Sequence, residues 1–246
     1  MEVKAEKINP YDDSRCKTEQ VQEMFDSIAP AYDFMNRAMT FGIDKLWRAK
    51  AVKLIGRQSP KAILDVATGT GDLAIKLAKT LNIEKVTGID LSEGMITVGR
   101  KKVNDAGLSN KIELVQGDCL ALPFADDNFD CITVAYGVRN FERLEAGYKE
   151  MLRTLKKGGM LCVIELSTPT SPIVRPLYKF YTRHIIPFVG RLVSKDVRAY
   201  SYLPESIAAV PQGNEMLALM QNAGFADCKY RPLTFGTCTI YTAFKR

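Results

Sequence analysis

A glycine turn between an apolar run and an amphipathic run constrains this chain more than any other stretch. Residues 63–78 read ILDVATGTGDLAIKLA, with β-type apolar residues before Gly69-Thr70-Gly71 and helical spacing after them. A strand that enters a helix through glycines usually holds a nucleotide, because the bare backbone lets the ligand approach closely. The stretch fits G-x-G-x-x-A and lacks the P-loop pattern G-x-x-x-x-G-K followed by Ser or Thr. A tight turn without a ligand is the alternative interpretation.

Short apolar runs alternate with helical runs along the rest of the chain. The segments FADCKYRPL and GTCTIYTAFK predict a closing antiparallel pair. The alternation predicts an α/β fold, a doubly wound Rossmann-like sheet of seven strands that is mostly parallel with the last strand antiparallel. We predict strands near residues 62–67, 85–90, 112–116, 129–135 and 159–166, and helices near 72–81, 93–106 and 142–156.

Helical segments precede and interrupt the predicted sheet. We expect a flexible terminus over residues 1–17, a helical cap over 18–60 and the α/β domain over 61–246. The proline-rich, apolar and aromatic segment 168–202 breaks the alternation, and it predicts an inserted helical lid.

Three residues mark predicted helix ends. Thr18 and Asp44 are candidate N-caps, because a short polar side chain can accept from the first free backbone N–H groups of a helix. Gly224 follows the helical run GNEMLALMQNA and is a candidate C-cap.

Composition excludes several classes of protein. The chain has 246 residues, 46% of them hydrophobic, which suits one large domain or one domain with an insertion. Its net charge of +6 is spread out, so no nucleic-acid-binding tail is indicated. The six cysteines form no C-x-x-C pair, and no secretory signal precedes them, so we expect reduced thiols in a cytoplasmic protein. With His184 as the single histidine, we predict no metal site.

Acidic residues around the glycine turn indicate which nucleotide it holds. Asp90 ends the second predicted strand, roughly 20 residues beyond Gly69, where an acid grips the hydroxyls of a ribose. Asp65 lies in the first strand and Asp72 follows the glycines, and these carboxylates would repel the pyrophosphate of a dinucleotide. S-adenosylmethionine carries an ammonium and a sulfonium but no phosphate, and therefore fits. The alternative role for Asp90 is to cap the next helix.

A further acid lies at the end of the third strand. In QGDCLALPF, the Asp118 carboxylate is placed to accept from an adenine amino group, and the N–H of Cys119 to donate to the ring. The alternative for Asp118 is a turn residue after Gly117. We predict these cofactor-binding residues: Asp65, Gly69, Thr70, Gly71, Asp90, Asp118 and Cys119.

Four stretches make the chain resemble a known family. They are YDFMNRAMTFGIDKLWR, YGVRNF, RTLKKGGMLCVIELS and YSYLPESI, and the likeness runs from about residue 20 to the end. The chain resembles the ubiquinone/menaquinone-biosynthesis C-methyltransferases, within the class I S-adenosylmethionine-dependent methyltransferases. It departs from that family's pattern at Asp44, Lys157 and Ala135. The resemblance places Ala135, where the family usually has serine, beside the cofactor.

The resemblance implies methylation of a ring carbon of a polyprenylated quinol. It implies catalytic roles for Arg139 and Tyr32, with Arg139 stabilising a developing quinolate or acidifying a bridging water, since a guanidinium is not a conventional base. Glu165 is a second candidate base. The alternative for Arg139 is a surface residue paired with Glu142. The substrate-binding residues implied are Asn36, Trp47 and Asn140.

The lid and the motif after the fourth predicted strand indicate which partners and which other activities are to be considered. The apolar lid suits a prenyl tail, so we expect peripheral contact with the inner face of a membrane; ordinary core and a homodimer surface are the alternatives. A nucleic-acid amine methyltransferase is disfavoured, because AYGVRN stands where its Asp/Asn-Pro-Pro-aromatic motif would be. Another small-molecule methyltransferase and a non-catalytic binding module remain open. The resemblance implies demethylmenaquinol, the benzoquinol precursor of ubiquinone, or both as acceptor, and we expect demethylmenaquinol.

Overall fold

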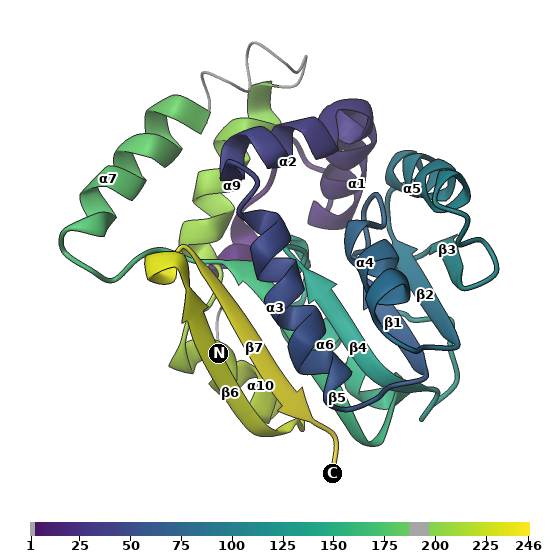
Figure 1. Cartoon of the computed structure of the whole chain (residues 1–246). Coiled ribbons are helices and arrows are strands. Elements are labelled where there is room, and N and C mark those ends of the chain that lie inside the picture. Colours follow the sequence, from purple (N-terminus) through teal and green to yellow (C-terminus); the bar gives the residue numbers. More distant parts are fainter. Residues whose placement is uncertain (1–2, 187–196) are drawn as a thin grey trace.

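Seven strands form one twisted sheet in the computed structural model, which describes residues 3–186 and 197–246 (Figure 1). Their spatial order is β3-β2-β1-β4-β5-β7-β6, with β7 antiparallel to both of its neighbours and the other pairs parallel. The predicted fold class is confirmed. The strands are β1 (Ala62–Val66), β2 (Lys85–Asp90), β3 (Ile112–Gln116), β4 (Phe129–Ala135), β5 (Leu155–Leu166), β6 (Ala226–Leu233) and β7 (Cys238–Phe244).

Helices cover both faces of the sheet, as expected for buried parallel strands. Residues of α3, α4 and α5 share one apolar core with one face, and residues of α6 and α10 share a second core with the other. The strand order reverses between β1 and β4, and ligands bind outside the carboxyl ends of strands at such a point. These helices are α3 (Asp44–Gly56), α4 (Asp72–Thr80), α5 (Glu93–Asp105), α6 (Leu144–Thr154) and α10 (Asn214–Asn222).

Further helices lie at the carboxyl ends of the parallel strands (Figure 1). The segment expected to be flexible contains a short 3₁₀ helix, with Val3 and Ala5 buried. The predicted lid includes two helical stretches, while residues 187–196 of it lie outside the described residues. No helix in the described ranges is long and apolar enough to span a membrane. The elements are η1 (Lys4–Lys7), α1 (Lys17–Ile28), η2 (Ala29–Ala31), α2 (Tyr32–Thr40), η3 (Val138–Asn140), α7 (Val174–Phe180), η4 (Tyr181–Ile185), α9 (Val197–Ala209) and η5 (Thr234–Gly236).

Both predicted N-caps are wrong, because their side chains bond elsewhere. Helix α1 begins at Lys17, and the Thr18 hydroxyl donates to Glu142 on a distant loop. Asp44 is the first residue of α3 rather than its cap, and its carboxylate pairs with Arg48 one turn later. Strand β5 also starts earlier than predicted, since Leu155 pairs with Phe129 ahead of a bulge.

The predicted C-cap at Gly224 is confirmed. Its φ is +106°, its N–H donates to Gln221 O at 2.9 Å, and the N–H of Phe225 donates to Met220 O at 3.1 Å. These two bonds satisfy carbonyls that the end of α10 would otherwise leave free.

We expect Gly224→Ala to destabilise the fold by about 1–3 kcal/mol, measured by urea denaturation. A Cβ at this position would strain the left-handed backbone and would meet Leu152 Cδ2 at 2.7 Å. Gly107 is a matched control, because it ends α5 with the same bonding pattern at φ +66° and has nothing within 4 Å of the built Cβ. Equal losses for the two variants would refute the packing contribution.

Candidate active site

The glycine turn after β1 is fastened by one carboxylate. Asp90 Oδ2 accepts from the N–H of Gly69 at 2.8 Å, and Oδ1 accepts from the N–H of Ser92 at 2.9 Å. Gly69 and Gly71 have φ of +57° and +77°, a backbone region that glycine enters without strain. Burial raises the pKa of Asp90 to about 6. The turn and the end of β2 therefore form one rigid unit with a partly desolvated acid at its edge.

A cavity of about 730 Å³ opens at this edge, between the strand ends and α1. Gly69 and Asp90 border one side of it. The predicted cofactor residues that line it are Gly69, Asp90, Asp118, Cys119 and Ala135. A nucleoside held on Asp90 and reaching toward Asp118 fits this arrangement.

Asp65 and Thr70, predicted to bind the cofactor, do not line that cavity. The Asp65 carboxylate is buried and accepts from the hydroxyls of Thr68 at 2.7 Å and Thr133 at 2.6 Å. The Thr70 hydroxyl donates to Asp33 on α2 at 2.6 Å. Gly71 also lies outside the cavity, at the N-cap of α4. These residues brace the turn, and Asp65 and Thr70 also line a smaller cavity that shares Gly69, Ala135 and Tyr136 with the first.

The carboxylate of Asp72 is compensated by neighbouring cations. It lies 2.6 Å from Lys102 Nζ and 3.8 Å from Arg48. The repulsion expected between Asp72 and a pyrophosphate is therefore reduced, so this residue contributes little to the choice of ligand.

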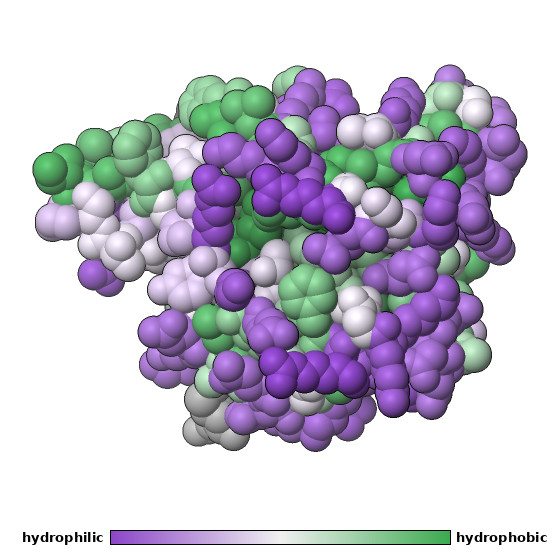
Figure 2. Space-filling model, turned by 60° about the horizontal axis from the view of Figure 1, so that its bottom comes forward, coloured by the Kyte–Doolittle hydropathy of each residue, from purple (hydrophilic) through white to green (hydrophobic). Residues whose placement is uncertain are grey.

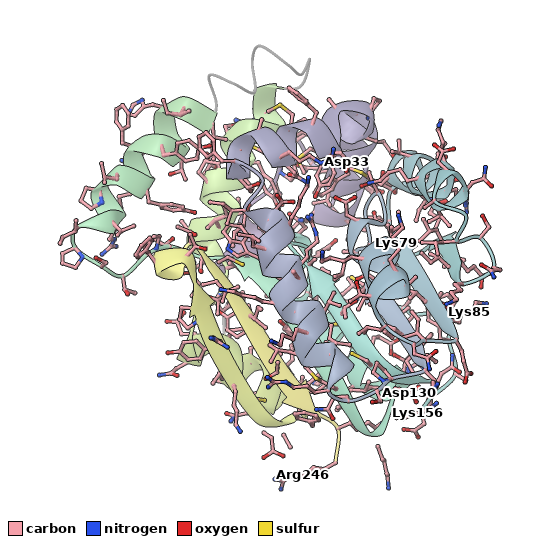
Figure 3. All side chains as sticks on the ribbon, in the orientation of Figure 1. Asp33, Lys79, Lys85, Asp130, Lys156 and Arg246 are labelled. Carbon is pink, nitrogen blue, oxygen red and sulfur yellow. The ribbon has the colours of Figure 1, made fainter. Side chains whose placement is uncertain are left out.

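The same lysine ties the N-terminal helices to the turn. Lys102 Nζ lies 2.5 Å from Asp33 of α2, which Figure 3 shows at the top of the sheet, and 3.0 Å from the Thr70 hydroxyl. Asp26 of α1 accepts from the N–H of Gly94 at 2.9 Å. Polar contacts thus hold α1 and α2 over the first cavity.

A second, larger cavity of about 1220 Å³ lies beside the first, and its walls are mainly apolar and aromatic. It extends under α7 and η4 toward the end of α2. Tyr32 and Tyr136 border both cavities, so these two rings stand between them. The other residues that face the second cavity include Asn36, Met39, Phe41, Trp47, Arg48, Arg139, Leu177, Tyr178, Tyr181 and Ile207.

Arg139 is buried at the inner end of the second cavity. Its guanidinium lies 2.8 Å from the Glu165 carboxylate and also donates to the carbonyl of Tyr136. Burial is the largest influence on Arg139 and opposes its charge, but Glu165, Tyr32 and Tyr202 together outweigh burial and raise the pKa of the guanidinium above its ordinary value. The alternative pairing with Glu142 is wrong, since Glu142 accepts from Thr18 instead.

Two buried side-chain polar atoms have no hydrogen-bond partner within the described part of the chain. They are Arg139 Nε and the Tyr136 hydroxyl, and both residues line the second cavity. A buried polar group without a partner is costly, so such a pair indicates a ligand with polar groups of its own.

The predicted substrate residues take different positions. Asn36 and Trp47 line the second cavity, but the Trp47 indole N–H already donates to the Thr234 hydroxyl at 2.8 Å. Asn140 borders the first cavity, and its Oδ1 accepts from Tyr202 at 3.1 Å. Burial raises the pKa of Tyr32, which keeps this phenol protonated at neutral pH.

The sequence places Tyr136 at the rim of a pocket without a role of its own, and it assigns no role to Arg48. The Arg48 guanidinium lies 5.4 Å from the centre of the Tyr136 ring, which it orients against the cavity. The only local signal was the position of Tyr136 at the end of β4. Within residues 3–186 and 197–246, no group of three or more His, Cys, Asp or Glu residues is arranged to hold a metal ion.

Comparison with known proteins gives consistent matches. The model of the ubiE/COQ5 methyltransferase family matches residues 13–245. A demethylmenaquinone methyltransferase of Bacteroides fragilis is 49% identical over 245 residues, covering 100% of both chains. The ubiquinone/menaquinone biosynthesis C-methyltransferase UbiE of Geobacter sulfurreducens is 44% identical over 230 residues, covering 93% of this chain and 90% of its own.

Solved structures share the fold at low identity. The [4+2]-cyclase SpnF has a TM-score of 0.67 at 17% identity, covering 93% of this chain and 96% of its own. A possible histamine N-methyltransferase from Thermotoga maritima has a TM-score of 0.64 at 20% identity, covering 92% and 99%. At such identities the likeness shows the fold alone.

Proposed function

Because the chain belongs to the ubiE/COQ5 methyltransferase family, we propose that it methylates a ring carbon of a polyprenylated quinol, with demethylmenaquinol as the preferred acceptor. The methyl donor is S-adenosylmethionine. One observation carries the proposal: Arg139 and Tyr136, whose Nε and hydroxyl are buried without partners, line a mainly apolar cavity that adjoins the cofactor cavity. A ring with two oxygens and a hydrocarbon tail matches this combination.

The residues of the first cavity fit the donor. We assign the ribose hydroxyls to Asp90, the adenine to Asp118 and the N–H of Cys119, and the methionine end to the region of Ala135. When bound, the cofactor supplies an electrophilic methyl group on a good leaving group. The protein's task is to align the acceptor carbon with that group at the boundary formed by Tyr32 and Tyr136.

Arg139 and Tyr136 then act on the acceptor oxygens. A quinol hydroxyl has an ordinary pKa of about 10, and loss of its proton makes the ring carbon nucleophilic. The Arg139 guanidinium stabilises the resulting oxyanion, while the Tyr136 phenol, whose pKa burial raises, remains a donor. Arg139 stays charged, so the hydroxyl proton goes to solvent, and Glu165 keeps the guanidinium in place. After methyl transfer, the methylated carbon loses its hydrogen as a proton and the oxygen takes one up, which restores the quinol.

The surrounding helices complete the proposed site. Helix α1 and the start of α2, from the predicted cap of residues 18–60, lie over the donor cavity. Residues of α7, η4 and α9, from the predicted lid and the helix that continues it, line the acceptor cavity. We propose a cytoplasmic enzyme in peripheral contact with the inner face of a membrane and no nucleic-acid substrate, since an apolar cavity does not suit a phosphate backbone. A homodimer is compatible with this arrangement.

Turnover of labelled S-adenosylmethionine by the purified chain tests the function. Reduced demethylmenaquinone and a reduced demethylated benzoquinone are each compared with their oxidised forms. Methylation of a reduced form alone supports transfer through a quinolate and identifies the ring. Absence of transfer to both, with the cofactor still bound in a calorimeter, would refute the quinol assignment.

Affinity for S-adenosylmethionine should fall as the pH drops below about 6. The pKa of Asp90 is raised to about 6, so the free protein holds a proton there at lower pH, and a neutral carboxyl is a poor acceptor for ribose hydroxyls. We expect the dissociation constant to rise up to about tenfold per pH unit below 6 and to level off above 7. Calorimetry between pH 5 and 8 measures this; Asp90→Asn should remove the dependence, and a flat wild-type profile would contradict it.

Tyr136→Phe should separate stability from activity. The substitution removes a buried hydroxyl that has no partner in the free protein, so thermal stability should hold or rise slightly. It also removes a donor to the acceptor oxygen, so kcat/KM for the quinol should fall about tenfold or more. Calorimetric melting and steady-state kinetics give the two quantities. A stability loss without a kinetic effect would mean that the hydroxyl has a structural partner.

A further inference from the structure

Two phenylalanines are both strained and exposed. Phe41 and Phe235 have φ of +51° and +56°, the left-handed region that bulky residues rarely adopt. Phe41 is 78% exposed and Phe235 is 80% exposed. Such backbone strain is normally offset by packing of the side chain. Packing within the chain offsets little of this strain. The ring of Phe41 approaches that of Tyr181, with 6.0 Å between the ring centres.

Both rings lie near the mouth of the second cavity. Phe41 lines that cavity directly, and Thr234, the neighbour of Phe235, lines it as well. Helix α7 adds further exposed apolar side chains, which Figure 2 shows on the arm at the left of the molecule. We call this surface the docking face; it comprises Phe41, Ile173, Leu177, Phe180 and Phe235.

Positive charge accompanies the docking face. Arg175, Lys179 and Arg183 are exposed on α7 and η4, and in the described ranges none of them has a carboxylate partner. The sequence contains no Asp or Glu between Glu165 and Asp196. Exposed apolar side chains beside unpaired basic residues are the composition of a surface that enters a lipid headgroup layer.

We propose that the docking face inserts into the headgroup region of a bilayer that contains anionic lipids. The inference rests on the proposed function, because a polyprenylated acceptor then enters the second cavity from the lipid phase. A symmetric contact with a second copy is disfavoured, since it would bring the basic residues of α7 together without any acid on that helix to neutralise them.

Binding of the full chain to vesicles tests the apolar part. Wild-type protein should float with phosphatidylcholine/phosphatidylglycerol vesicles, with no cofactor or quinol present. The triple variant Ile173→Ser, Phe180→Ser, Phe235→Asn should bind about tenfold more weakly or worse. Asparagine tolerates the left-handed backbone, so the fold should be kept, which cofactor binding verifies. Tyr230→Ser, at an exposed aromatic on the sheet edge, is the control and should bind like wild type.

A second triple variant tests the charges. Arg175→Gln, Lys179→Gln, Arg183→Gln should bind anionic vesicles about tenfold more weakly and lose the preference over pure phosphatidylcholine. The control Lys79→Gln, Lys85→Gln, Lys101→Gln makes the same change in net charge, and Figure 3 shows Lys79 and Lys85 on the side away from α7. That control should keep the preference.

Three results would overturn the proposal: no vesicle binding by the wild type, no effect of either triple variant, or a wild-type dimer in solution that the apolar variant dissociates. The last would make the docking face a contact between copies. Because these measurements need no turnover, their outcome does not depend on whether a quinol is the substrate. Vesicle binding without methylation would refute the function, and methylation of a short-tailed quinol without vesicle binding would refute only the docking face.

Discussion

Arg139→Met is expected to lower kcat with the quinol by about 10²–10³-fold while the dissociation constant of S-adenosylmethionine changes little. The guanidinium is the cation that borders the acceptor cavity from η3, and its Nε has no partner in the free protein. An oxyanion that develops on the acceptor would lose its main stabilising charge. Arg139 does not border the first cavity, so donor affinity should persist.

For Arg139→Met, an effect on the stability of the fold has to be distinguished from an effect on the rate of methyl transfer. Removing Arg139 leaves the buried Glu165 unpaired, which typically costs about 3–5 kcal/mol. The double variant Arg139→Met, Glu165→Gln removes that charge and should recover much of the stability without recovering turnover. Recovery of near-wild-type kcat in the double variant would show that Arg139 acts only by compensating Glu165.

Asp90→Ala should weaken S-adenosylmethionine binding by about 10²–10³-fold, measured by calorimetry. The carboxylate has two functions: it accepts from the N–H groups of Gly69 and Ser92, and it is the acid that faces the ribose position. Hydrogen bonds to a charged group contribute about 1.5–3 kcal/mol each, and the variant loses those to the ligand as well as the brace on the turn.

Asp65→Asn is the control for this prediction. Asp65 is almost fully buried and accepts from two threonines. It lies outside the first cavity but lines the smaller one beside it. The substitution should lower thermal stability and leave donor affinity within about threefold of wild type. A larger loss of S-adenosylmethionine affinity in Asp65→Asn than in Asp90→Ala would contradict the assignment of the ribose to Asp90.

The sheet and the donor side of the site could be predicted because their signals are local. The run ILDV before the glycines is apolar on both faces, as a strand buried between two helical layers must be. The spacing between Gly69 and Asp90 predicts that both lie at the ends of neighbouring strands. Their hydrogen bond follows from the parallel pairing of β1 with β2.

The roles of Asp65, Thr18 and Asp44 depended on partners that the local sequence does not reveal. Asp65 is opposite Thr133 in the register of β1 and β4, so its carboxylate accepts from that hydroxyl, and it also lines a small cavity beside the glycine turn. Thr18 bonds to Glu142 from more than 100 residues away along the chain. Likewise, the unpartnered hydroxyl of Tyr136 is a property of the assembled cavity, visible only once the surrounding side chains are placed.

Because Tyr32 and Tyr136 line both cavities, the two reactants can reach the site by different routes, and this affects the free-energy cost of bringing the lipid acceptor to the donor. In the proposed function, one reactant is dissolved in water and the other in hydrocarbon, and the two meet at the boundary between the cavities. Exposing a prenyl tail to water would cost about 0.8 kcal/mol for each CH₂ group. An acceptor that enters the second cavity from the lipid phase, as proposed above, avoids that cost, because its prenyl tail never has to dissolve in water.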